Sequence, residues 1–86
     1  MRTYEMRFPG FDARSNRGPI RWELFLHPDV RDVLVTPRED TLMVLFRGEP
    51  DPSGWARTLE AAGFPAPRSA EERDERLATP PHDAAA

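Results

Sequence analysis

The stretch VRDVLVTPREDTLMVLFRGEPDPSGWARTLEAAGF, residues 30–64, decides the fold because its strand, turn and helix signals follow one another without a gap. Val33 and Val35 alternate with Asp32 and Leu34, which is the two-residue period of a strand. Pro37 lies where a turn needs a fixed φ, and the apolar run 42–46 follows directly. The pattern predicts a β-hairpin with strands over 31–36 and 41–47.

The second half of this stretch has the start and stop signals of a helix over 52–62. Asp51 is a good N-cap residue and Pro52 suits the first helical position. Apolar residues then recur at helical spacing, up to Leu59. Gly63 lies where a left-handed residue ends many helices, and Phe64 is placed to contact Leu59 as in a Schellman motif.

Upstream of residue 30 the signals are less uniform. Residues 3–8 alternate, which predicts a first strand, and residues 9–19 have the Pro, Gly, Asp and Asn content of a loop. Residues 20–26 fit either of two elements. Ile20 and Leu24, four apart, fit a helix of about 19–27 that Pro19 opens and Pro28 ends, whereas Ile20, Trp22, Leu24 and Leu26 alternate as in a strand.

Composition limits the classes of protein to which this chain can belong. The 86 residues carry 12 Arg, no Lys, 15 acidic residues and no Cys, for a net charge of −3. An all-Arg basic set is typical of a GC-rich bacterial genome. The absence of cysteine excludes disulfides and thiolate sites, and the longest apolar run, 42–46, is far below the ~20 residues of a membrane helix. We therefore expect a cytoplasmic protein that does not bind membranes.

The charge is distributed unevenly along the chain. Residues 1–68 contain ten Arg and ten acidic residues, whereas residues 69–86 contain two Arg and five acidic residues. A neutral body lacks the basic surface that supplies nucleic-acid affinity, so no nucleic-acid partner is expected. We predict a single α+β domain over 1–68 and an acidic tail over 69–86, with a short helix at 70–78 and disorder beyond it.

The 30–64 stretch resembles the heavy-metal-associated domain, the small ferredoxin-like module of copper chaperones and metal-pumping ATPases. The matching positions form the family's Val-x-x-Val-x-Val strand, second strand, helix-initiating Asp and Leu-x-x-Ala-Gly-aromatic helix end. They are Val30, Val33, Val35, Leu42, Val44, Phe46, Asp51, Leu59, Ala62, Gly63 and Phe64. The resemblance implies a two-layer βαββα(β) sandwich with a short last strand near 65–68. The alternative is a four-stranded antiparallel meander with one helix.

The same resemblance places the family's metal loop on residues 8–16 and its first helix on 17–30. The two metal-binding cysteines then fall at Ala13 and Asn16, with Phe11 in the place of the family's Met. Without these thiolates a soft-metal site of the family's kind cannot form. Gly18-Pro19 is a second departure, which we expect to delay the helix to residue 19.

No residue pattern predicts an active site, so we expect no catalytic residues, no cofactor and no enzyme activity. His27 with Asp29, and His82 with Asp83, fall short of the three or four ligands that a zinc site needs, so no metal is expected. Strand parity places Leu34, Met43 and Leu45 on the sheet face that the helices leave open, and such a patch is typical of an interface. With Trp22 as a lesser candidate, these residues predict a non-catalytic protein-interaction module, either a homodimer or a small regulatory subunit. A metal-binding chaperone-like domain without its thiolate site and an RNA- or DNA-binding domain are the alternatives.

Overall fold

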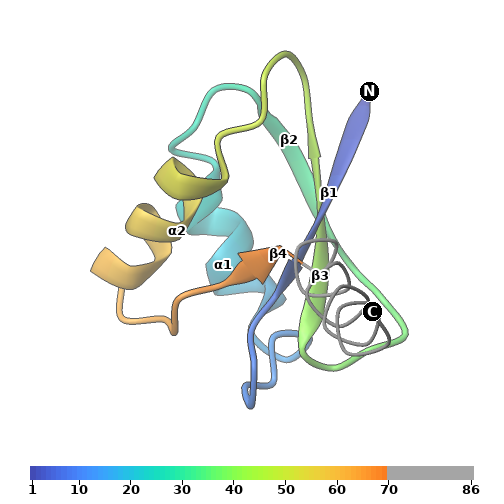
Figure 1. Ribbon diagram of the computed structural model, residues 1–86, viewed down its shortest axis with the longest axis vertical. Helices are drawn as coiled ribbons and strands as arrows, with labels where there is room; N and C mark the ends of the chain where they lie inside the picture. Colours follow the sequence, from blue (N-terminus) through green and yellow to red (C-terminus); the bar gives the residue numbers. More distant parts are fainter. Residues whose placement is uncertain (70–86) are drawn as a thin grey trace, which may run out of the picture.

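The computed structural model describes residues 1–69, which form a four-stranded antiparallel sheet with two helices on one of its faces (Figure 1). The elements follow in the order β1 (Arg2–Arg7), α1 (Arg17–Leu24), β2 (Val30–Val35), β3 (Thr41–Phe46), α2 (Pro52–Ala61) and β4 (Arg68–Ser69). The strand order β2-β3-β1-β4 is the ferredoxin-like order. The predicted fold is therefore confirmed. The tail helix expected at 70–78 and the segment beyond it lie outside the described residues.

The hairpin and second helix form where the sequence predicted them. The side chain of Asp51 accepts a hydrogen bond from the Gly54 N–H at 3.1 Å, as an N-cap should. At the other end, Phe64 N–H donates to the Leu59 carbonyl and Gly63 N–H donates to that of Glu60, both at 3.0 Å. Gly63 has a φ of +97°, so the Schellman ending is confirmed.

The first helix differs from the sequence prediction at both ends. Residues 20–26 begin as a helix, which excludes the meander, but α1 starts at Arg17 and ends at Leu24 instead of running over 19–27. Pro19 is the third residue of the helix, where its missing N–H would have had no intrahelical partner. Gly18-Pro19 therefore does not delay the helix, and the expectation that it would is wrong.

The core lies between the sheet and the two helices. Its central member is Trp55 of α2, whose ring meets Tyr4 at 5.6 Å and Phe46 at 5.3 Å in edge-to-face geometry. The remaining buried apolar residues are Met6, Phe8, Ala13, Ile20, Leu24, Val30, Val33, Leu42, Val44 and Leu59. The strand residues that point toward the helices are thus mostly those that the alternation of the sequence predicted.

Strand β2 departs from simple alternation at one point. The pairing with β3 skips one residue between Val30 and Asp32, so that both Val30 and Val33 point into the core. Val35 lies opposite buried Leu42, as predicted for the helix side of the sheet, yet it is 51% exposed. The reason is its position at the end of an edge strand.

Candidate interaction surfaces

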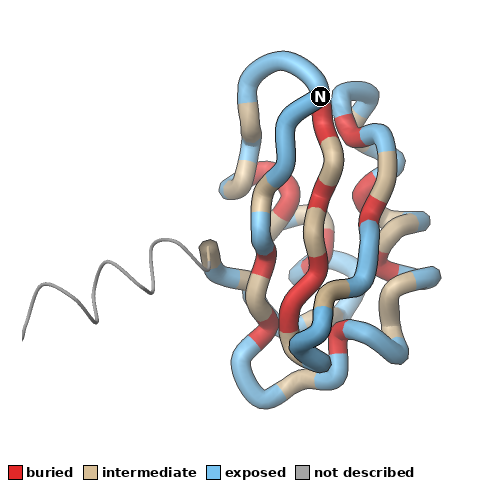
Figure 2. The backbone as a smooth tube through the Cα atoms, turned by 90° about the vertical axis from the view of Figure 1, so that its right-hand side faces the viewer, coloured by how far each residue is buried: buried red, intermediate tan, exposed pale blue. Residues whose placement is uncertain are grey.

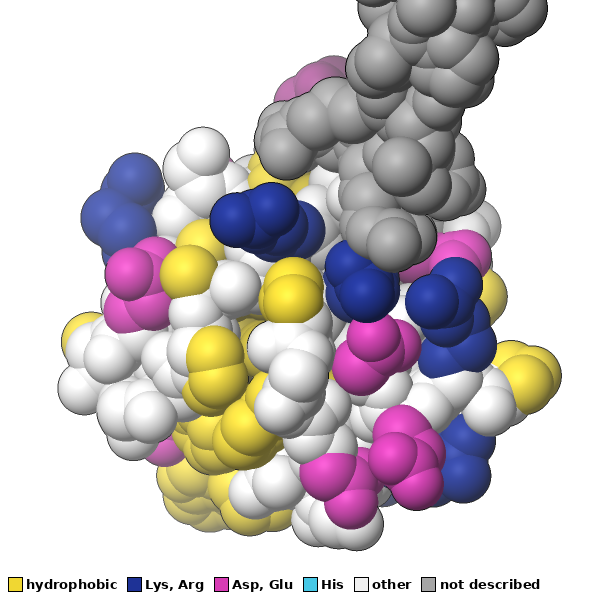
Figure 3. Space-filling view, turned by 60° about the horizontal axis from the view of Figure 1, so that its bottom comes forward, with side chains coloured by type: hydrophobic (Ala, Val, Ile, Leu, Met, Phe, Trp, Pro, Cys, Tyr) yellow, Lys and Arg dark blue, Asp and Glu magenta, His cyan; other side chains and the backbone are white. Residues whose placement is uncertain are grey.

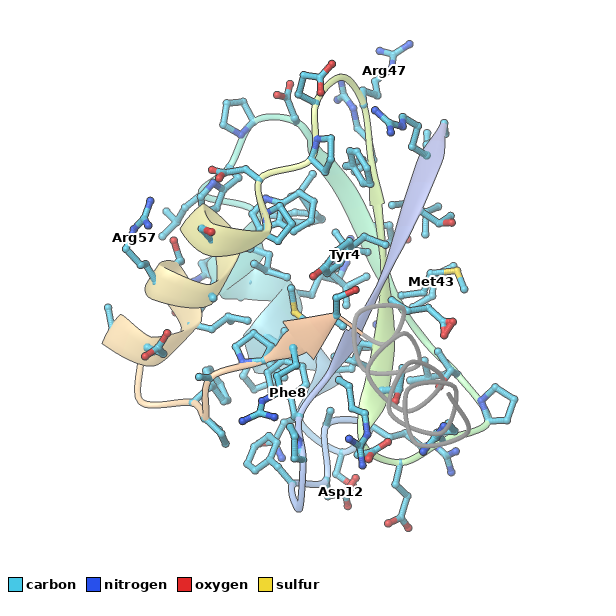
Figure 4. All side chains as sticks on the ribbon, in the orientation of Figure 1. Tyr4, Phe8, Asp12, Met43, Arg47 and Arg57 are labelled. Atoms are coloured by element: carbon cyan, nitrogen blue, oxygen red, sulfur yellow. The ribbon has the colours of Figure 1, made fainter. Side chains whose placement is uncertain are left out.

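The open face of the sheet carries three apolar side chains in adjacent positions. Leu34 of β2 lies directly opposite Met43 of β3, and Leu45 follows two residues later on β3. Met43 points away from the helices (Figure 4), and Figure 2 shows residues of β3 alternating between buried and half-buried. Leu34 is 38% exposed, while Met43 and Leu45 are half-buried. We call these three residues the sheet-face patch.

Polar residues of β1 border this patch. Thr3 lies opposite Leu45 and Glu5 opposite Met43, and both are exposed. None of the described strand residues on this face is aromatic, so the face lacks the rings on which RNA-recognition domains stack bases. Apolar residues in the centre with polar neighbours on one side form the usual arrangement of a protein-binding surface.

One end of this face is held by an ion pair. The Nε of Arg7 donates to the Asp40 carboxylate at 3.0 Å, and the Thr41 hydroxyl donates to the same carboxylate at 2.8 Å. Partial burial by itself would raise the pKa of the Asp40 carboxyl, but these hydrogen bonds outweigh it and hold the pKa below its ordinary value. The turn 36–40 is thereby fastened to β1.

The free edge of β2 is closed by side chains. The Val33 N–H donates to the Asp32 carboxylate at 2.8 Å, and the Val33 carbonyl accepts from Arg17 Nε at 2.6 Å. Arg21 binds the same carboxylate at 2.8 Å, and its hydrogen bond is the main cause of the lowered pKa of Asp32. Both backbone polar groups of Val33 are therefore occupied, so at this residue the edge offers no free group to an added strand.

A second apolar surface lies on the solvent side of α1. Trp22 is 76% exposed, Leu26 72% and Phe25 40%, and together they line a hollow of about 250 Å³. The guanidinium of Arg21 lies 4.3 Å from the centre of the Phe25 ring. Sequence reasoning identified Trp22 but missed Phe25 and Leu26, although their i+3 and i+4 spacing from Trp22 was a usable signal.

The loop that the resemblance aligns with the family's metal site is filled by its own side chains. Ala13 is fully buried in the core, and Phe11 packs against Phe8 and Phe64. The Asp12 carboxylate accepts from both the hydroxyl and the N–H of Ser15, at 2.7 and 3.1 Å, and these bonds lower the pKa of Asp12. Within residues 1–69 no three His, Cys, Asp or Glu side chains converge as metal ligands would.

Asn16 and His27 likewise have structural partners. The Asn16 amide donates to the Asp12 carbonyl at 2.8 Å, which helps to close the loop. The His27 Nε2 lies 2.7 Å from the Thr58 hydroxyl, so this ring links the end of α1 to α2 and does not pair with Asp29. His82 and Asp83 lie outside the described residues.

Charged side chains of both signs lie interspersed at the end of the domain that carries the 8–16 loop (Figure 3). Within the described part of the chain, no helix has the length and apolar character to cross a membrane.

Comparison with known proteins supports the fold and little more. No family model matches the chain, and no curated protein matches it either. A solved structure described as "Crosstalk between Cu(I) and Zn(II) homeostasis" is similar, with a TM-score of 0.63 and 23% identity. The match covers 80% of this chain and 99% of that chain. At this identity the likeness shows a common fold.

Proposed function

We propose that this protein is a non-catalytic protein-interaction module that binds a partner protein through the sheet-face patch. The observation that carries the proposal is the register of β2 and β3, which brings Leu34, Met43 and Leu45 together on the face without helices. A cluster of this kind adds little to the core, because its residues lie on the other side of the sheet. Its burial by a second protein would remove apolar surface from water.

Exposed charged residues lie around the patch. Arg47 follows β3 directly and Arg68 lies opposite Arg7 in β4. Both are exposed, and among the described residues neither has an ion-pair partner. Glu5, opposite Met43, is exposed as well, so charges of both signs surround the patch, which suits a protein surface with an apolar centre and a polar rim.

The experiment compares two variants that add the same charge to opposite faces of the sheet. Met43→Glu places a carboxylate in the patch, and Val35→Glu places one at an exposed apolar position on the helix side. Tagged wild-type and variant proteins are used to capture partners from lysate of the source organism. Each captured protein is identified, purified and titrated against the three chains.

A partner that binds the wild type and Val35→Glu, but binds Met43→Glu at least ten-fold more weakly, supports the proposal. Circular dichroism and thermal unfolding must show that both variants are folded. A partner that binds all three proteins equally well contradicts the assignment to the patch. Failure of every captured protein to bind the purified wild type contradicts the interaction function itself.

A second candidate function is metal handling, favoured by the fold likeness to the structure described in terms of Cu(I) and Zn(II) homeostasis. The loop residues argue against a direct site, because Ala13 is buried and the Asp12 carboxylate is already bound by Ser15. Calorimetry with Cu(I) and Zn(II) distinguishes the two candidates. Stoichiometric binding at micromolar metal would favour metal handling.

A further inference from the structure

Apolar residues lie on both sides of helix α1 and of the turn that follows it. Its inner face buries Ile20 and Leu24 completely, while Trp22, Phe25 and Leu26 project to solvent. A helix that covers a sheet in a monomer normally has charged or polar residues on its outer face. We call the outward row of Gly18, Trp22, Phe25 and Leu26 the outer stripe of α1.

None of the four residues of the outer stripe is charged, and the one charged group stacked on them is the guanidinium of Arg21, 4.3 Å from the centre of the Phe25 ring. Gly18 and Trp22 are spaced four residues apart on α1, and Leu26, four residues further on, lies in the turn that follows the helix and lines the same hollow as Trp22. Arg21 and Glu23 lie about a quarter turn to either side of this row. Arg21 is already paired with Asp32 at 2.8 Å, so a surface placed against the stripe would meet no unpaired cation from this residue.

The stripe has a small residue at one end and large residues at the other. A Cβ added to Gly18 would meet no atom within 4 Å, so the space above this residue is open. Leu26, two turns further on, projects with 72% of its surface exposed. An antiparallel copy of the same row, centred on Trp22, would place Leu26 of each copy over Gly18 of the other.

We propose that the outer stripe of α1 is a self-association surface on which a second copy of this chain packs its own α1 in antiparallel orientation. Rows of residues spaced four apart interdigitate in the most frequent class of helix packing. The antiparallel orientation also aligns the two helix dipoles favourably. The interface is isologous, since the same stripe serves both copies.

The area of the stripe makes this a weak dimer. An aromatic side chain can bury roughly 150–250 Å². From their exposed fractions, Trp22 and Phe25 together offer roughly 250 Å² per copy, and Leu26 adds about 100 Å². Two copies then bury roughly 700 Å² of apolar surface, below the ~1,600 Å² of a standard interface. We therefore look for a weak dimer, with a dissociation constant of about 10 µM to 1 mM.

Sedimentation equilibrium over about 10 µM to 2 mM, a span set by that dissociation constant, tests the proposal on the full chain. We expect concentration-dependent dimerisation that Trp22→Ser and Leu26→Ser each weaken at least ten-fold. Val35→Ser is the matched control, because it removes an exposed apolar side chain outside the stripe. Met43→Glu should dimerise like the wild type, since the proposal uses a different surface from the sheet-face patch.

A wild-type chain that stays monomeric over this range overturns the proposal. So does a dimer that Met43→Glu abolishes and Trp22→Ser leaves intact, which would assign self-association to the sheet face. Loss of partner binding in Met43→Glu with normal dimerisation would leave both proposals standing, so the two can fail independently.

The orientation is tested by cross-linking, which the absence of cysteine from the chain makes clean. Gly18→Cys and Leu26→Cys proteins are oxidised separately and as an equimolar mixture. The antiparallel arrangement brings residue 18 of one copy to residue 26 of the other, so the mixed disulfide should exceed its statistical share. The antiparallel pairing is contradicted if the 18–18 and 26–26 cross-links form as readily as the 18–26 cross-link or more readily. It is also contradicted if the 18–26 yield is no higher than the yield of a Val35→Cys control.

Discussion

Replacement of glycine by alanine should have opposite effects on stability at two positions, Gly63 after the end of α2 and Gly18 in α1. Gly63 and Gly18 both have open space where a Cβ would be added. They differ in the backbone, because Gly63 has a φ of +97° whereas Gly18 lies in the first turn of α1. Substitution by Ala at the two sites therefore isolates the conformational contribution.

Gly63→Ala should lower the free energy of unfolding by about 1–2 kcal/mol, the cost of holding an L-residue in a left-handed conformation. Gly18→Ala should raise it by about 0.5–1 kcal/mol, because Ala has the better helix propensity and reduces the entropy of the unfolded chain. In a domain of this size 1 kcal/mol corresponds to roughly 4–8 °C in the melting temperature.

Thermal and urea unfolding, followed by circular dichroism, measure both changes. The protein is held near 5 µM, below the roughly 10 µM at which self-association is expected to begin. Gly63→Asn adds an internal check: because Asn tolerates positive φ better than Ala does, the stability of this variant should lie between those of the wild type and Gly63→Ala. A Gly63→Ala protein as stable as the wild type would refute the reasoning, because the helix would then end without the left-handed residue on which the Schellman hydrogen bonds depend.

Three further predictions concern other polar contacts. Asp51→Ala should cost about 0.5–2 kcal/mol as the N-cap is lost. Gly54→Ala should also destabilise the wild type, because its Cβ would collide with the Asp51 carboxylate, but the same change should be neutral or stabilising in an Asp51→Ala background. Urea unfolding of the four proteins measures these differences. The lowered pKa of Asp40 contributes stability above about pH 3.9, its unfolded value, and this contribution is lost as the pH falls through the folded pKa. Asp40→Asn should therefore cost up to about 1 kcal/mol at pH 7 and approach the stability of the wild type as the pH falls below the folded pKa, whereas a pH-independent difference would contradict the ion pair. Asp32→Ala frees the Val33 N–H at the sheet edge and should accelerate aggregation in static light scattering relative to Glu23→Ala, and equal rates would argue against edge protection.

Local sequence signals were enough to predict the secondary structure of residues 30–64. The Pro37 turn, the Asp51 cap and the Gly63 ending each involve residues within six positions of one another, so their hydrogen bonds are encoded by short-range chemistry. The alternation in β3 likewise predicted which side chains leave the core, and Met43 lies where parity placed it.

The rest needed contacts between segments that are distant in the sequence. Residues 20–26 satisfied the periods of a helix and of a strand, and the choice follows from packing of Ile20 and Leu24 onto the sheet. The start of α1 at Arg17 is supported by the bond from this side chain to the Val33 carbonyl, sixteen residues away. Helical periodicity alone did not show which face of α1 would meet the sheet. The exposure of Trp22 was therefore decided by the tertiary structure, because only one side of a helix can pack on a sheet.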